Sequence, residues 1–132
     1  MVSLDNETAL NQVRLFSEID ILVAAHGAGL ANLIYMVPNS YLIELMPPYW
    51  DWACYQRLAE NADVCYKLIR SVGKKGPECN KNPFSLTCRN KGIRDRNFNA
   101  SIDDVLNLVR IASGKVFRKK YGVFEFSLFC LK

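Results

Sequence analysis

The stretch from Asp20 to Asn32 combines residue types that can bind an anion. An apolar run over residues 20–25 leads into His26-Gly27-Ala28-Gly29, and a helix-like segment begins at Leu30. Glycines let the backbone approach a ligand without a Cβ in the way. The free N–H groups and the positive dipole end of the following helix favour a phosphate or diphosphate. The sequence therefore predicts an anion site at this corner.

His26 is the sole histidine of the sequence and directly follows the apolar run. An imidazole there can hydrogen-bond a phosphate or a sugar hydroxyl. Two alternatives stay open from the residues alone: a tight strand-to-helix connection without a ligand, and a buried histidine that bonds a backbone carbonyl. A dinucleotide fingerprint fits less well, because Asn32 stands where the G-x-G-x-x-G pattern has its third glycine.

An acidic residue ends the next apolar run. Glu44 lies 18 residues after His26, within residues 41–45. The carboxyl ends of parallel strands meet at one edge of a sheet, where α/β folds bind ligands. We therefore expect Glu44 near His26, accepting hydrogen bonds from ribose hydroxyls. A surface carboxylate paired with an arginine is the alternative.

Four aromatic residues follow that run. Tyr49 and Trp50 lie in the loop after Pro48 and are candidates for stacking on a nucleotide base. Trp52 and Tyr55 belong to a helical stripe, which usually packs into a core.

Cysteines and glycosylation motifs favour an oxidising compartment. The five cysteines are Cys54, Cys65, Cys79, Cys88 and Cys130, and sequons begin at Asn6 and Asn99. A bond between Cys79 and Cys88 would close a short loop and stabilise it by roughly 2–3 kcal/mol. The odd number leaves at least one thiol without a partner in the chain. Both features point to the secretory lumen, with chance sequons and reduced thiols as the alternative.

The elements that would carry these residues alternate. We expect helices over residues 4–17, 30–36, 51–61 and 102–112, and strands over residues 20–25, 41–45 and 64–69. Short buried strands between helices predict a parallel α/β sheet covered on both faces, of Rossmann-like type. Residues 72–100 read as a long irregular loop, and Gly114 is expected to end the last helix. The domain thus spans residues 1–114, and the tail over residues 115–132 has no assignment.

Charge is distributed unevenly along the chain. Residues 1–71 hold four Lys/Arg against eight Asp/Glu, whereas residues 72–132 hold thirteen against five. The basic residues are scattered and share no helical face with interleaved aromatics, so a nucleic-acid partner is not expected. No apolar run approaches the roughly 20 residues of a membrane span. Neither is there a signal-peptide pattern at the start. Membrane attachment is expected only through an anchor absent from this chain.

The residues around His26 resemble glycosyltransferase family 61. The family pattern is an HGAGL-x-N loop, a helix, a proline turn, and a strand ending in Glu-Leu-x-Pro. Here the loop is His26-Gly27-Ala28-Gly29-Leu30 with Asn32, and the strand is Tyr41-Leu42-Ile43-Glu44-Leu45 before Pro47. The match covers roughly residues 8–70. The sequence departs from the commonest pattern at Asn39, where the turn often contains glycine.

The resemblance implies a GT-B architecture, in which the C-terminal of two Rossmann-like domains holds the nucleotide sugar. It implies transfer of a sugar from a UDP-sugar to a glycoprotein or glycan acceptor, with inversion and without an essential metal or a cofactor. The compartment it implies is the lumen of the endoplasmic reticulum or Golgi apparatus.

Residue by residue, the resemblance assigns donor binding to His26, Gly27, Ala28, Gly29, Leu30, Asn32 and Glu44, and it gives no metal ligand. Family chains are several times longer, so the acceptor-side domain and the catalytic base are expected outside this sequence. No catalytic residue is therefore assigned. A non-catalytic nucleotide-binding remnant and, less well supported, an NAD- or FAD-binding Rossmann domain are the alternatives.

Overall fold

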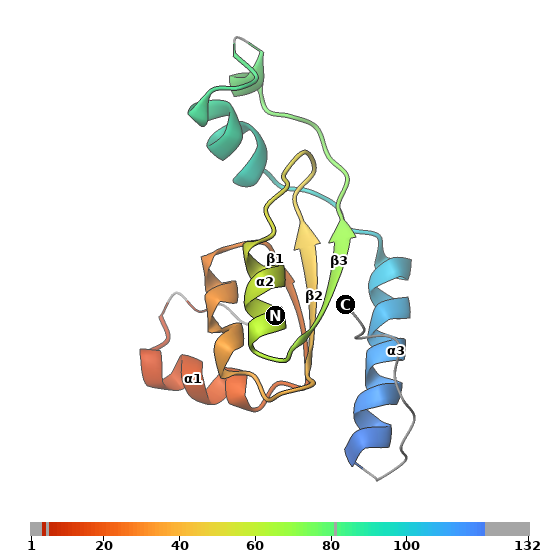
Figure 1. Ribbon diagram of the computed structural model, residues 1–132. Helices are drawn as coiled ribbons and strands as arrows, with labels where there is room; N and C mark the ends of the chain where they lie inside the picture. Colours follow the sequence, from red (N-terminus) through yellow and green to blue (C-terminus); the bar gives the residue numbers. More distant parts are fainter. Residues whose placement is uncertain (1–3, 5, 81, 121–132) are drawn as a thin grey trace.

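The core of the fold is a three-stranded parallel sheet. The computed structural model describes Leu4, residues 6–80 and residues 82–120. The strands β1 (Ile21–Ala25), β2 (Tyr41–Met46) and β3 (Cys65–Arg70) lie side by side in chain order (Figure 1). This confirms the expected α/β class, and the arrangement is compatible with a Rossmann-like fold.

Helices cover both faces of the sheet. The helices α1 (Ala9–Ser17), η1 (Ala28–Tyr35) and α2 (Cys54–Asn61) pack on one face. The long helix α3 (Ile102–Lys120) packs on the other and contacts all three strands (Figure 1). The connections from β1 to β2 through η1 and from β2 to β3 through α2 therefore cross the same face of the sheet, and α3 covers the opposite face.

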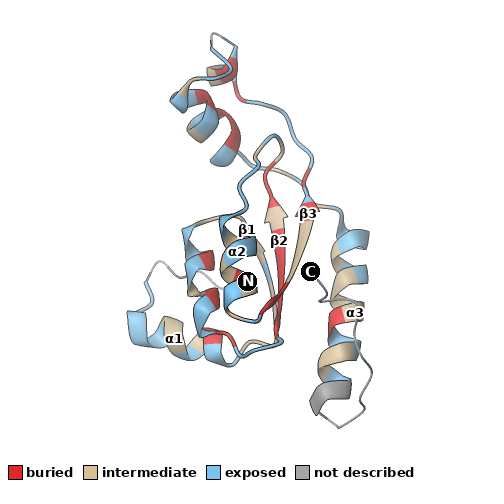
Figure 2. Ribbon diagram, viewed as in Figure 1, coloured by how far each residue is buried: buried red, intermediate tan, exposed pale blue. Residues whose placement is uncertain are grey.

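The central strand is buried almost throughout, as Figure 2 shows. Alternate side chains of a strand point to opposite faces. Leu42 belongs to the larger core cluster beneath α1, η1 and α2, whereas Tyr41 packs with Ala112 of α3. Glu44 follows Leu42 by two residues, so its carboxylate enters the helix-covered apolar layer.

The turn into β2 uses an asparagine where the family often has glycine. Asn39 has φ 65°, in the left-handed region, and its N–H donates to the Asp63 carbonyl at 2.6 Å. Asparagine tolerates this conformation better than most residues. The departure at Asn39 thus keeps the turn that glycine would favour.

Helix boundaries differ from those expected at two amino ends. The helix α1 begins at Ala9 rather than at residue 4, because Thr8 caps it by accepting from the Asn11 N–H at 3.2 Å. The helix α2 begins at Cys54 without a side-chain cap. Asp51, where the sequence predicts this helix to begin, instead pairs with Arg70 at 3.3 Å on the surface.

Gly114 does not end the last helix, contrary to the sequence prediction. The helix α3 continues to Lys120. A glycine inside a helix costs about 1 kcal/mol relative to alanine. Ala112 and Val116, on either side of Gly114, both pack against the sheet and offset that cost. The start of the unassigned tail is therefore helical, and residues 121–132 lie outside the described part of the chain.

The expected long loop contains a small folded unit. Its two short helices are η2 (Pro77–Cys79) and η3 (Cys88–Arg94), and a disulfide joins Cys79 to Cys88 as predicted. We call residues 77–94 the stapled segment. An antiparallel bridge between Val72 and Asn99 closes its base. Figure 1 shows the segment standing beyond the carboxyl ends of the strands.

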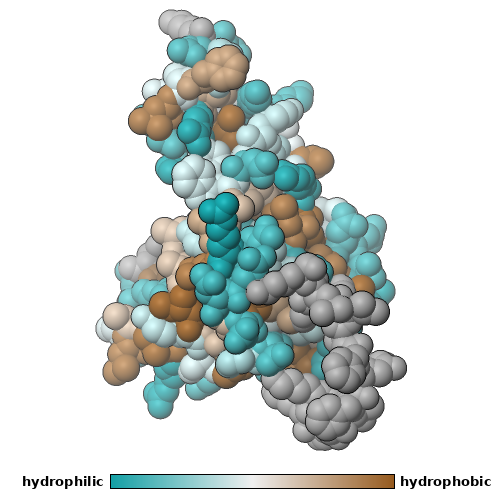
Figure 3. Space-filling view, viewed as in Figure 1, coloured by the Kyte–Doolittle hydropathy of each residue, from teal (hydrophilic) through white to brown (hydrophobic). Residues whose placement is uncertain are grey.

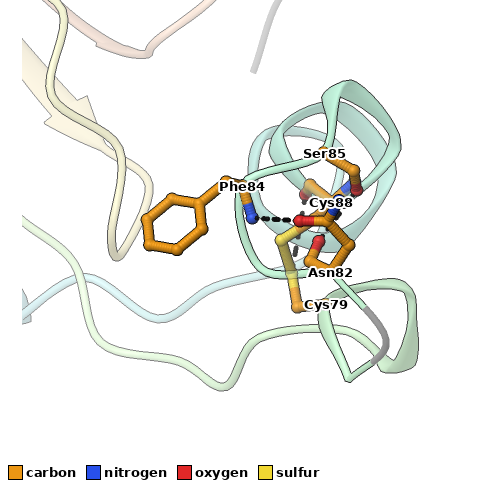
Figure 4. The surroundings of a disulfide bond; sticks show 5 residues. All are labelled: Cys79, Asn82, Phe84, Ser85 and Cys88. Atoms are coloured by element: carbon orange, nitrogen blue, oxygen red, sulfur yellow. Dashed lines mark hydrogen bonds between the residues drawn. A yellow bond between two sulfur atoms is a disulfide. The ribbon is translucent and has the colours of Figure 1, made fainter.

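Short polar contacts order the stapled segment around its disulfide (Figure 4). The Asn82 side chain accepts from the Phe84 N–H at 3.0 Å, and the Ser85 hydroxyl accepts from the Cys88 N–H at 3.1 Å. A Cβ on Gly92 would lie 2.6 Å from Cys79 Sγ. Glycine is therefore required where η3 approaches the disulfide.

Apolar side chains are scattered over the surface of both parts of the molecule (Figure 3). Phe84 is 90% exposed and Leu86 72%, both in the stapled segment, while Leu10 and Ile34 are exposed on the body. Scattered apolar residues are normal on the surface of a folded protein. Among the residues that the structure describes, no helix has the length and apolarity needed to cross a membrane.

Removing the disulfide is expected to loosen the stapled segment and leave the sheet intact. In Cys79→Ser/Cys88→Ser the short loop loses a constraint worth roughly 2–3 kcal/mol. Because the segment makes its own small cluster of Cys79, Cys88 and Ile93, the opening should be local. Hydrogen exchange should therefore speed up over residues 77–94 and stay unchanged in β2. Cys54→Ser, at the exposed free cysteine, is the control. Equal loss of protection in β2 would contradict this expectation.

Candidate functional site

His26 lies at the carboxyl end of β1 with both ring nitrogens engaged. Its backbone N–H donates to the Leu45 carbonyl at 3.0 Å and so continues the ladder between β1 and β2. The Nδ1 atom lies 2.5 Å from Glu44 Oε1, and the Trp50 indole donates to Nε2 at 3.0 Å. The side chain is 7% exposed. The histidine bonds a carboxylate here and not the backbone carbonyl considered from sequence.

These two contacts define the proton position of the imidazole. An indole N–H can only donate, and an ionised carboxylate can only accept. The arrangement is satisfied when Nδ1 carries the proton and donates to Glu44, leaving the Nε2 lone pair to accept from Trp50. His26 is then neutral beside an ionised Glu44.

Glu44 is a buried acid with hydrogen-bond donors at both oxygens. Its side chain is 0% exposed. His26 contacts Oε1, and the Tyr66 hydroxyl donates to Oε2 at 2.6 Å. A buried carboxylate is costly unless it is hydrogen-bonded. The pair of donors from β1 and β3 therefore holds a charge that the apolar layer would otherwise reject.

The negative charge of Glu44 contributes to raised pKa values of neighbouring groups. Burial first, and then the hydrogen bond to Glu44, raise the pKa of Tyr66 far above its usual range. Burial likewise raises the pKa of Tyr55, and the Cys54 and Glu44 charges add to that effect. The pKa of Cys54 is also raised, by burial and then by Glu44. Tyr66 thus remains a hydroxyl donor at neutral pH.

Aromatic rings surround the imidazole. Tyr55 meets it edge-on, with ring centroids 5.2 Å apart, and Trp50 is tilted at 5.9 Å. Trp50 in turn stacks on Trp52 at 6.3 Å with an interplanar angle of 22°. Tyr55 packs on the core as expected, whereas Trp52 is 48% exposed, so the prediction of core packing was wrong for Trp52. Trp52 projects from the loop before α2 begins, outside the helical stripe.

Two cations accompany the aromatic residues of this loop. The Lys75 ammonium lies 4.8 Å from the Tyr49 ring centroid, and the Arg89 guanidinium lies 5.4 Å from that of Trp50. Tyr49 is 65% exposed and has φ 64°. Tyr49 is therefore largely exposed with Lys75 over its ring, while Trp50 is already engaged by His26 and by the stapled segment.

The glycine corner has space beside it. Gly27 has φ 174°, an extended conformation that any residue adopts, and among the described residues a Cβ there would meet just the Ala25 carbonyl oxygen, at 4.0 Å. Ala28 and Gly29 are exposed and open η1, where N–H groups lack partners inside the helix. Gly27 therefore leaves room at the corner, whereas a Cβ on Gly29 would lie 3.2 Å from Leu4 Cδ1, and neither glycine serves a left-handed turn.

Three predicted donor-site residues are placed differently from expectation. Leu30 is buried in the core, and its N–H donates to the Gly27 carbonyl at 3.0 Å, so it presents neither group to a ligand. Asn32 donates to Gln12 Oε1 at 2.8 Å and ties η1 to α1. Glu44 does lie beside His26, but its buried, fully engaged carboxylate leaves no oxygen for a ribose in this arrangement.

Sequence reasoning missed Tyr66, Lys75 and Arg89. Tyr66 is one residue of an ordinary apolar strand, and the register that pairs Leu42 with Tyr66 brings its hydroxyl toward Glu44. Lys75 and Arg89 were scattered charges in an apparently irregular loop. No sequence spacing links them to His26, since the stapled segment had to fold back first.

The structure places both sequon asparagines on the surface and describes three of the cysteines as disulfide-bonded. Asn6 and Asn99 are both exposed, which N-glycosylation requires. Cys65 is disulfide-bonded in addition to Cys79 and Cys88, and Cys54 is free. Within the described ranges, no three His, Cys, Asp or Glu side chains are grouped as a set of metal ligands.

Comparison with known families supports the resemblance seen around His26. Residues 1–43 match the family model Glycosyltransferase 61. The match includes α1, β1, the His26 corner and η1, and reaches into β2. It confirms the resemblance over about a third of the chain and supports a glycosyltransferase activity. No curated protein matches the chain.

Proposed function

We propose that this chain is the donor-binding part of a glycosyltransferase that takes a sugar from UDP. The acceptor would be a glycoprotein or glycan, and the transfer would invert the sugar and need no metal. The family match supports the general activity. The disulfide and the exposed sequons support the lumen of the endoplasmic reticulum or Golgi apparatus.

The observation that carries the proposal is the open corner at Gly27. It lies where a parallel sheet binds ligands, next to His26 and at the start of a helix. The N–H groups of Ala28 and Gly29 would receive the diphosphate. Lys75 and Arg89, at the same edge of the sheet, would neutralise the negative charge of the diphosphate, as a metal ion does in other enzymes. Tyr49 would stack on the base.

Calorimetry with UDP and uridine tests this assignment. We expect UDP to bind and uridine to bind more weakly, with the UDP affinity unchanged by EDTA. Lys75→Gln and Arg89→Gln should each weaken UDP about threefold to tenfold, on the order of 1 kcal/mol, and affect uridine little.

Arg94→Gln is the matched control, because Arg94 lies on the same segment but is paired with Asp95 at 2.7 Å. No heat and no thermal stabilisation at millimolar UDP on folded protein would refute the proposal. Binding of UDP without transfer or hydrolysis, when an acceptor is supplied, would instead identify a non-catalytic nucleotide-binding remnant.

A further inference from the structure

The atom that His26 offers at the strand end is a hydrogen-bond acceptor. Glu44 requires the proton on Nδ1, and the Trp50 indole points its own N–H at Nε2 from 3.0 Å. If Nε2 carried a proton, its N–H and the indole N–H of Trp50 would face each other as two donors without an acceptor between them. A ligand that replaces the indole must therefore bring a donor of its own.

Trp50 is held at His26 by residues far along the chain. Its ring packs against the cluster of Cys79, Cys88 and Ile93 in the stapled segment. The guanidinium of Arg89, from the same segment, lies over the ring, and Trp52 stacks on it. The position of the indole thus depends on a unit that is separate from the sheet.

We propose that Trp50, held by the stapled segment, is a positioning residue that keeps Nε2 of His26 unprotonated. A ligand group that displaces the indole from Nε2 is then a hydroxyl of the transferred sugar or of the ribose, and not an oxygen of the diphosphate. The identity of the ligand rests on the proposed function, whereas the state of the imidazole does not. The diphosphate is left to the helix N–H groups with Lys75 and Arg89.

Nitrogen-15 NMR of the free protein tests the imidazole directly. The sequence has one histidine, so its two ring nitrogens need no assignment by mutagenesis. We expect a protonated Nδ1 and an unprotonated Nε2. In Trp50→Phe, which keeps an aromatic ring but lacks the donor, the Nε2 signal should move. Trp52→Phe is the control, because phenylalanine keeps a ring that can stack on Trp50 and Trp52 makes no hydrogen bond to His26 in the structure. A protonated Nε2, or an Nε2 signal unmoved by Trp50→Phe, would overturn the proposal.

The same signal tests the stapled segment. Cys79→Ser/Cys88→Ser should move Nε2 in the same direction as Trp50→Phe and should speed hydrogen exchange at the Trp50 indole. Cys54→Ser should change neither. An indole that stays equally protected in the double variant would show that the segment does not hold Trp50, and would overturn that half of the proposal.

Adding UDP separates this inference from the proposed function. At saturation we expect Nε2 to remain unprotonated. A shift of Nε2 to the protonated position would mean that His26 donates to the diphosphate, which contradicts the inference while supporting nucleotide binding. If UDP does not bind at all, the proposed function fails, and the spectra of the free variants still decide the role of Trp50.

Discussion

Replacing Glu44 by alanine is expected to lower the free energy of unfolding by about 2–6 kcal/mol, because each of two hydrogen-bond donors that loses its acceptor costs about 1–3 kcal/mol. The change leaves His26 Nδ1–H and the Tyr66 hydroxyl without their acceptor, inside a layer that excludes water. Domains of this size are stable by only about 5–15 kcal/mol. Urea unfolding followed by circular dichroism measures the loss.

Two milder variants keep the test decisive if the alanine variant does not fold. Glu44→Gln retains one acceptor oxygen but turns an amide N–H₂ toward a donor, so we expect a loss of about 1–3 kcal/mol. Tyr66→Phe removes one donor and leaves the His26 pair intact, so its loss should be smaller than that of Glu44→Ala. Equal stability of the parent and Glu44→Gln would show that the carboxylate is not buried as an ion.

Replacing Gly27 by alanine is expected to abolish or strongly weaken UDP binding without destabilising the fold. The extended backbone accepts alanine, and among the described residues the new Cβ would have no neighbour closer than 4.0 Å. A methyl group in the proposed diphosphate position should cost at least about 1.4 kcal/mol, or tenfold in affinity. Calorimetry with UDP and thermal unfolding of the same samples give the two readouts.

Gly114→Ala is the matched glycine control. A Cβ at Gly114 also meets nothing within 4 Å in the part of the chain that the structure describes, but the position lies in α3, on the opposite face of the sheet from η1. The substitution should raise stability by up to about 1 kcal/mol and leave UDP binding unchanged. If Gly27→Ala bound UDP with unaltered affinity, the corner at Gly27 would not be part of the UDP-binding site.

Much of the fold follows from local patterns. The apolar runs of the three strands and the helical spacing between them predict the parallel sheet, because a strand buried on both faces needs a continuous apolar sequence. The predicted helix boundaries were wrong where packing against the sheet outweighed the local preference of the residues. Gly114 reads as a helix end, yet its neighbours Ala112 and Val116 gain enough from the sheet to carry α3 onward.

The site was predicted in part. Sequence reasoning brought His26 and Glu44 to the same edge, since both lie at the carboxyl ends of parallel strands, but it assigned Glu44 to a ligand. Burial changes that role, because a carboxylate with no exposed surface must use its oxygens on neighbouring donors. Tyr66 becomes such a donor through the register of β3 against β2.

The sequence by itself determined the order of strands and helices, the small-residue corner after β1 and the Cys79–Cys88 closure, because each depends on residues close together in the chain. Only the tertiary structure decided that Trp50 donates to His26 and that Arg89 lies over Trp50. Those contacts join segments 24 and 39 residues apart, and no local preference sets their distance. They exist because the stapled segment folds back over the carboxyl edge of the sheet.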